Sequence, residues 1–166
     1  MTLVEVMVGL AVGSLLMASI MTLFSFSSRS MVSLLNYAEL ERQSQHALDI
    51  MSRDIRSVLR LVENTTTSLT FVDNDGTSLR YAYNPEAKTL VRTKGNASEI
   101  LLEGCDSLSF SIFQRNTQQS TFDQFPAGSA STCKLLQLNW HCTRKILGSV
   151  MNTESMQSAK IVIRTH

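Results

Sequence analysis

Residues 6–26, VMVGLAVGSLLMASIMTLFSF, form a stretch of 21 residues that contains no charged side chain. At a rise of 1.5 Å per residue, a helix of this length spans the hydrocarbon layer of a membrane, which is about 30 Å thick. The apolar run begins at residue 2, and no basic residue precedes it as in a secretory signal, so we expect the mature protein to retain it. The stretch therefore predicts an N-terminal transmembrane helix.

The chain as a whole has the size and composition of one folded domain. Of the 166 residues, 43% are apolar, which is enough to bury a core, and the net charge is only +1. Basic and acidic residues are balanced in both halves of the chain, which disfavours a nucleic-acid-binding arm. The apolar content disfavours a disordered protein, and three cysteines are too few for a disulfide-dense miniprotein.

Glu5 interrupts the apolar pattern near the N-terminus. A carboxylate placed at the membrane centre costs about 2.5 to 3.5 kcal/mol, so we expect Glu5 to have a partner. One candidate is the positive N-terminal end of its own helix, which attracts acidic side chains. The other is the α-amino group of residue 1, either in the same chain, where it lies about 6 Å away along a continuous helix, or in a neighbouring chain. Both interpretations stay open.

Gly9 and Gly13 lie four residues apart within the same stretch. This G-x-x-x-G spacing allows two helix backbones to approach each other closely. Alone it is weak evidence for helix association, because such spacings occur by chance. Together with Glu5 it suggests a helix that packs against copies of itself.

A helical pattern continues beyond the membrane stretch. Apolar residues recur at spacings of three and four, at Met31, Leu34, Leu35, Ala38, Leu48, Met51, Ile55, Val58 and Val62. No proline precedes Pro85, so we expect one helix of about 60 residues, roughly 90 Å long, that ends before the polar cluster 64–68. Its second half is amphipathic and is predicted to pack on a folded head, with a dimeric coiled coil as the alternative.

After Ser68 the apolar period changes from 3.6 to 2, which is typical of antiparallel strands. We expect a long polar connection over 114–132, a loop over 148–158, and strands at 69–72, 78–83, 89–93, 99–103, 106–113, 134–141 and 159–164. The predicted fold class is α+β, with a hydrophobic transmembrane helix over 1–28, an amphipathic helix over 29–63 and an antiparallel β-sheet head domain over 64–166.

The pairing of Cys105, Cys133 and Cys142 stays open. Cys133 and Cys142 are nine residues apart on one predicted strand, or about 30 Å, whereas a disulfide requires Cα atoms within about 7 Å. Any bridge within these strands must therefore include Cys105. If strands 106–113 and 134–141 pair directly, Cys105 falls on the polar face and Cys142 on the core face, but a bulge at Gly104 would reverse this.

Motifs for catalysis or metal binding are missing from the sequence. None of the three histidines, His46, His141 and His166, stands beside a second ligand at metal spacing, and there is no G-x-S-x-G, H-E-x-x-H or phosphate-binding glycine loop. We therefore expect a protein that is not an enzyme and that uses neither a metal nor a cofactor. Basic head residues could meet nucleic acid, although a solvated face is the simpler interpretation of Arg80, Arg92, Arg144, Lys145, Lys160 and Arg164.

The sequence Met1-Thr2-Leu3-Val4-Glu5-Val6-Met7-Val8, followed by the apolar stretch, resembles the mature N-terminus of type IV pilins and type II secretion pseudopilins. In those proteins, prepilin peptidase cuts before this segment and methylates its first residue. The close resemblance covers residues 1–28. The remainder is similar, more loosely, to the J and W group of minor pilins and pseudopilins.

The resemblance implies a structural subunit of a type IV pilus or pilus-like filament, with the segment 1–28 in the filament core. Met1 would be the site of processing and methylation, and Glu5 would pair with the methylated amine of a neighbour's residue 1. Gly9 and Gly13 would lie at helix contacts. The implied partners are identical or related pilin subunits, prepilin peptidase and the inner-membrane assembly machinery.

The same resemblance implies an inner-membrane location before assembly and then an extracellular pilus or a periplasmic pseudopilus. Two alternatives stay open. One is a minor pseudopilin that initiates a type II secretion filament and contacts exported proteins. The other is a bitopic membrane protein with a periplasmic binding domain, which would not need Glu5.

Overall fold

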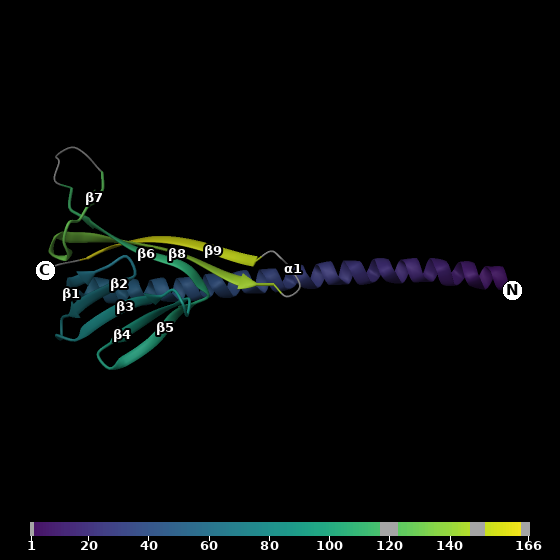
Figure 1. Ribbon diagram of the computed structural model, residues 1–166, viewed down its shortest axis with the longest axis horizontal. Coiled ribbons are helices and arrows are strands. Elements are labelled where there is room, and N and C mark those ends of the chain that lie inside the picture. The colour runs from purple at the N-terminus through teal and green to yellow at the C-terminus, as the bar shows by residue number, and fades with distance from the viewer. Residues whose placement is uncertain (1, 117–122, 147–151, 164–166) are drawn as a thin grey trace.

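The computed structural model describes residues 2–116, 123–146 and 152–163. In this part of the chain a long helix, α1 (Leu3–Ser57), is joined to a head built of strands (Figure 1). The strands gather around the C-terminal half of α1, whereas the N-terminal half projects away from them. The predicted α+β class, with a long N-terminal helix packed on antiparallel strands, is confirmed.

Consecutive strands are neighbours in the first sheet, which is an antiparallel meander. Its order is β1-β2-β3-β4-β5, and its strands are β1 (Val58–Asn64), β2 (Ser68–Asp73), β3 (Ser78–Asn84), β4 (Thr89–Lys94) and β5 (Ala97–Glu103). Gly76 and Gly95 have φ values of 81° and 57° in hairpin turns, a conformation that glycine adopts without steric cost. The strands predicted at 69–72, 78–83, 89–93 and 99–103 all lie within this sheet.

Later strands form a second antiparallel sheet, so the predicted meander is divided between two sheets among the described residues. Its order is β7-β6-β8-β9, and its strands are β6 (Cys105–Gln114), β7 (Phe125–Pro126), β8 (Cys133–Lys145) and β9 (Asn152–Val162). The chain passes from β5 to β6 at Gly104, where φ is 68°. The predicted polar connection 114–132 carries β7 and a short 3-10 helix, η1 (Ala130–Thr132).

The prediction of a loop over 148–158 was wrong from Asn152 onward. β9 begins at Asn152 and pairs with β8 along its whole length. Thr153 and Ser155 are its buried side chains in this part, with exposures of 7% and 6%. Because these inward residues are small and polar, the alternation of apolar and polar residues that marks a strand is missing there. Arg164, at the end of the predicted last strand, lies outside the described residues.

A stripe of buried residues sets the face of α1 that packs on the head. Its members are Leu40, Ser44, Ala47, Met51 and Ile55. Spacings of three and four keep these residues on one face of a helix with 3.6 residues per turn. The helix contacts strands of both sheets, including β9, β8 and β5. The chain therefore buries this stripe against its own head, as the sheet-packing interpretation predicted.

α1 ends at Ser57, so the prediction of a helix to residue 63 was wrong. The side-chain amide of Asn74, in the turn between β2 and β3, donates to the Ser57 carbonyl at 2.7 Å and so satisfies a group at the helix end. Beyond this point two register shifts interrupt the pairing of β1 with β2. They allow Val58 and Leu61 to be buried together, whereas Val62 is exposed. A bulged strand thus shows the three-residue spacing of a helix.

Polar contacts fasten the helix stripe to both sheets. The Trp140 indole N–H of β8 donates to the Ser44 hydroxyl at 3.2 Å, and the Gln157 amide of β9 donates to Glu41 at 2.9 Å. On the other sheet the Tyr81 hydroxyl donates to Asp54 at 2.7 Å. Burial, with the Asp54 contact as a second cause, raises the pKa of Tyr81, so this hydroxyl remains a donor. These bonds position the head at one end of α1 and leave the other end uncovered.

Candidate functional site

The exposed half of α1 is the most unusual surface of the described chain. Every large apolar side chain of residues 3–37 is exposed, with exposed fractions from 39% at Val32 to 76% at Leu3. Leu40 is the first buried residue of the helix. A continuous apolar surface of this size is rare on soluble monomers and marks a membrane or protein contact. We call residues 3–37 the apolar rod.

By length and composition, the helix that carries the apolar rod is long and apolar enough to cross a membrane. In 35 residues, however, a helix rises about 52 Å, which exceeds the hydrocarbon thickness of about 30 Å. Arg29 is the one charged residue between Glu5 and Glu39, and apolar side chains continue beyond it to Tyr37. A membrane that covers the first 26 residues would therefore leave a second apolar section between the membrane and the head.

That second section was predicted to pack on the head, and this prediction was wrong. Its exposed fractions are 63% at Met31, 67% at Leu34 and 60% at Leu35, and Ala38 is also exposed. The described head meets the helix at Asn36, whose side-chain amide donates to the Lys145 carbonyl at the end of β8 at 3.4 Å, but Leu40 is the first helix residue that is buried. The sequence pattern shows which face is apolar, but it does not show where the cover begins.

Glu5 closes a capping box at the start of α1. The Thr2 backbone N–H donates to Glu5 Oε2 at 2.7 Å, and the Glu5 backbone N–H donates to Thr2 Oγ1 at 3.4 Å. Each side chain thus satisfies a backbone donor that the helix leaves free. In the single chain, Glu5 thus bonds to the N-terminus of its own helix, which is the first of the two interpretations. Pairing with a neighbour's terminus involves a second chain and stays a prediction, and Met1 lies outside the described residues.

Gly9 and Gly13 leave open space beside the helix. A Cβ atom added at either glycine would meet no atom within 4 Å outside the helix's own backbone. The two positions are one turn apart on the same side of α1. The geometry therefore provides a shallow notch against which a second backbone can pack.

Three hydroxyl side chains in the N-terminal part of the rod donate to carbonyls of their own helix, a feature that was not predicted from the sequence. Ser14 donates to the Ala11 carbonyl at 2.8 Å, Ser19 to the Leu15 carbonyl at 2.9 Å, and Thr22 to the Ser19 carbonyl at 2.8 Å. These back-bonds leave no free hydroxyl donor at Ser14, Ser19 or Thr22 that would oppose burial. At these three positions the rod can therefore enter lipid or a protein core at little polar cost.

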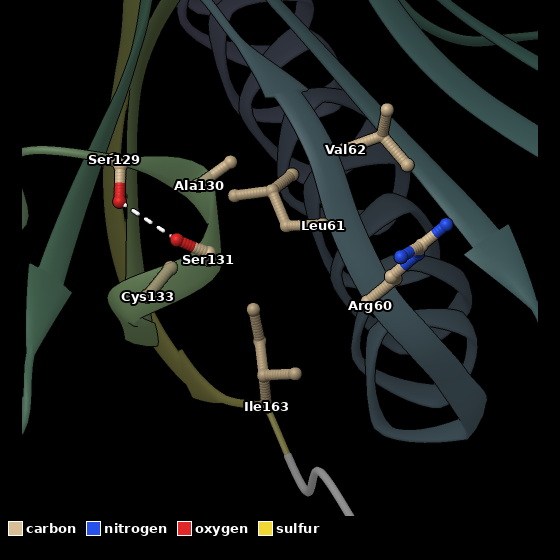
Figure 2. A pocket seen from close by; sticks show the side chains of 8 residues that line it. All are labelled: Arg60, Leu61, Val62, Ser129, Ala130, Ser131, Cys133 and Ile163. Carbon is tan, nitrogen blue, oxygen red and sulfur yellow. Dashed lines mark hydrogen bonds between the residues drawn. The ribbon is translucent and has the colours of Figure 1, made fainter.

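A hollow of about 520 Å³ lies in the head between β1, η1 and the residues after β9 (Figure 2). Its lining is Arg60, Leu61, Val62, Ser129, Ala130, Ser131, Cys133 and Ile163. The Ser129 and Ser131 hydroxyls lie 2.9 Å apart and bond to each other. The lining contains neither a histidine nor a carboxylate that would act as a base for these hydroxyls. Among the described residues no group of three or more His, Cys, Asp or Glu side chains is arranged to hold a metal ion.

Basic residues of the head form ion pairs with carboxylates. The ion pairs are Lys88 with Asp106, Arg92 with Asp54, and Lys94 with Asp73. His141 lies 3.5 Å from the Glu154 carboxylate and is partly exposed. Arg92, one of the basic residues considered for nucleic-acid contact, is thus paired with a carboxylate of α1 inside the molecule.

The sequence matches no protein-family model, and no curated protein shows significant similarity to it. The features of the molecule that bear on function are the apolar rod, its capped N-terminus and the head that leaves it uncovered.

Proposed function

We propose that this chain is a structural subunit of a type IV pilus or a pilus-like filament. The apolar rods of many copies pack together in the filament core, and the heads form the outer sheath. The observation that supports this most is the length of the uncovered apolar surface, about 52 Å against about 30 Å of membrane. Neighbouring rods can cover all of it, including Met31, Leu34 and Leu35, whereas lipid covers only the first part.

In this proposal Glu5 sets the axial register between neighbouring copies. A carboxylate buried without a cation among apolar helices is strongly destabilised, so each copy takes the position at which Glu5 meets a neighbour's N-terminal amine. The capping box uses Glu5 Oε2 for the Thr2 N–H. An ionised carboxylate accepts several hydrogen bonds, so the box and the intermolecular ion pair are compatible.

Before assembly the same rod would hold the subunit in the inner membrane, with the head outside the cytoplasm. Prepilin peptidase would process and methylate the chain at Met1, and separate assembly proteins would extract the subunit from the membrane. The satisfied hydroxyls of Ser14, Ser19 and Thr22 support this step, because these side chains keep their hydrogen bonds when the rod exchanges lipid for protein.

Three substitutions separate the two roles of Glu5. Glu5→Gln keeps a side-chain acceptor for the capping box but removes the negative charge. Thr2→Ala weakens the capping box and keeps the charge. Asp49→Ala removes an exposed carboxylate from the same helix outside the rod and serves as the matched control. Each variant is expressed as the full chain, membrane insertion is measured by fractionation, and filaments are counted by electron microscopy.

We expect Glu5→Gln to reduce filaments at least about tenfold, a change of about 1.4 kcal/mol per subunit contact, with membrane insertion unchanged. Thr2→Ala and Asp49→Ala should assemble nearly as the wild type does. Normal filaments from Glu5→Gln would show that the charge has no assembly role. Stable insertion without filaments in the wild type, when the assembly machinery is present, would favour a bitopic membrane protein instead.

A further inference from the structure

Cys105 and Cys142 face each other across two neighbouring strands of the head. They are register partners in the antiparallel pair of β6 and β8. Their exposed fractions are 0% and 1%, and both are free thiols. Directly opposed residues of an antiparallel pair have Cα atoms about 4.5 to 5.5 Å apart, within the range that a disulfide requires.

A bulge puts the two side chains on the same face. Cys105 pairs with Cys142, but the next pair is Ser107 with His141, so Asp106 is an extra residue on β6. The extra residue reverses the alternation and turns Cys105 inward, toward the face that carries Cys142. From the sequence, a bulge at Gly104 was the expected way to turn Cys105 to the core face, and the structure places the bulge just beyond Gly104.

The surrounding backbone holds this geometry. The Thr143 N–H donates to the Gly104 carbonyl at 2.9 Å, and the Cys105 N–H donates to the Lys88 carbonyl at 2.9 Å. The Tyr83 hydroxyl donates to the Cys105 carbonyl at 2.9 Å. The pair therefore lies at the junction where the chain passes from the first sheet to the second, and it is fixed from both.

Cys133 has a different environment. Its register partner is Gln114, at the opposite end of the β6–β8 pair, and it lines the hollow shown in Figure 2. Nine residues of strand separate it from Cys142, a distance of about 30 Å. The geometry therefore selects one pair from the three cysteines.

We propose that Cys105 and Cys142 form a disulfide bond between β6 and β8 of the second sheet, next to the passage from the first sheet at Gly104, while Cys133 remains a thiol. The oxidising environment rests on the proposed function, which places the head outside the cytoplasm. The oxidant is a disulfide donor, either a thiol–disulfide oxidoreductase or glutathione disulfide.

Two exchange steps form the bond. The Cys142 thiolate attacks one sulfur of the donor, which breaks the donor's S–S bond, forms a mixed disulfide and releases one donor thiol. The Cys105 sulfur then attacks the Cys142 sulfur of the mixed disulfide and releases the second donor thiol. The two cysteine protons end on the two donor sulfurs, and the donor gains the two electrons. Because both side chains are buried in the folded head, the exchange takes place as the head folds.

The sequence permits a direct test by mass spectrometry. Trypsin cleaves after Lys94, Arg115, Lys134 and Arg144, so each cysteine falls on its own peptide: 95–115, 116–134 and 135–144. Full-length protein is isolated from membranes without reductant, and its free thiols are alkylated under denaturing conditions before digestion. In a second arm, reduced full-length protein is refolded in the presence of glutathione disulfide.

We expect peptides 95–115 and 135–144 to be joined and peptide 116–134 to be alkylated. Cys133→Ser should keep the joined pair, whereas Cys105→Ser and Cys142→Ser should lose it. Reduction of the wild type should lower the melting midpoint of the head by about 5 to 10 °C, with no such effect on Cys142→Ser. Three alkylated cysteines in both arms, or a link to Cys133, would overturn the proposal.

The results also separate this proposal from the proposed function. Filaments built from subunits with three free thiols would contradict the disulfide alone. A joined pair in a protein that never forms filaments, with the assembly machinery present, would contradict the proposed function alone.

Discussion

Arg92 Nε donates to the Asp54 carboxylate at 2.6 Å, and this ion pair joins β4 to α1. The side chains are only 19% and 14% exposed, and the Tyr81 hydroxyl donates to the same oxygen of Asp54. One carboxylate of the helix therefore satisfies two donors of the first sheet.

Asp54→Ala should lower the free energy of unfolding by about 2 kcal/mol or more, because it leaves a guanidinium and a hydroxyl without their acceptor in a largely dehydrated place. Urea unfolding of the full chain, followed by the fluorescence of Trp140, measures the change. Glu39→Ala is the control, because its ion pair with Arg42 is much more exposed, at 37% and 69%, and its loss should have a far smaller effect. Equal effects of the two substitutions would contradict the prediction.

Gly104→Ala should destabilise the head by about 2 kcal/mol, because the residue has a φ of 68° and an added Cβ would lie 2.9 Å from the Thr143 carbonyl oxygen. Gly128→Ala is the matched control, because an added Cβ there meets no atom within 4 Å. The same urea unfolding compares them. A Gly104→Ala protein as stable as the Gly128→Ala protein would show that the passage between the sheets tolerates a side chain.

The stability that the Asp106 carboxylate contributes to the head should be lost in acid. Hydrogen bonds from the Lys88 ammonium and the Thr143 hydroxyl hold the pKa of Asp106 below its usual value. A lowered folded-state pKa gives stability that is fully present above the unfolded value of about 3.9 and is lost as the pH falls through the folded value. Asp106→Asn should therefore be less stable than the wild type near pH 7, and this difference should shrink as the pH falls below about 4. A difference that stays constant from pH 7 to pH 2 would contradict this assignment.

Leu34→Asn with Leu35→Asn should block assembly without affecting membrane insertion. Both residues belong to the section of the rod that lies beyond the reach of a membrane and before the head. Burial of each leucine against a neighbouring copy contributes about 1.5 to 3 kcal/mol, so the double variant should form at least about tenfold fewer filaments. Leu59→Asn with Val62→Asn is the control, because these exposed apolar residues lie on the head. Wild-type filament counts from the rod variant would show that other copies do not cover this section.

The parts of the fold that could be predicted from sequence have local causes. The uncharged stretch and the repeat that includes Met51 and Ile55 predict the long helix and its buried face. Turns at Gly76 and Gly95 separate strands with clear alternation, so β2, β3, β4 and β5 of the first sheet were predicted, whereas β1 was not. In each case the neighbouring residues alone determine the local conformation.

The parts that were missed depend on contacts distant in sequence. The end of α1 at Ser57 relies on Asn74, and the register shifts of β1 come from its pairing with β2. The first half of β9 buries Thr153 and Ser155 against the rest of the head, and because both residues are polar, no apolar pattern predicts a strand there. Of the candidate site, the rod, its glycines and Glu5 were visible in the sequence. The sequence did not show how much of the rod the head leaves uncovered, because this depends on how the strands of the folded head pack along the helix.

Helix α1 continues into β1 at Val58 without a connecting loop. A force applied along the helix axis therefore acts directly on β1, because no flexible loop between them can extend first. The contacts of Asp54 with Arg92 and of Ser44 with Trp140 transmit part of that force to both sheets. In a fibre under tension, rod and head would behave as one stiff mechanical unit, and strain would appear first between subunits rather than within them.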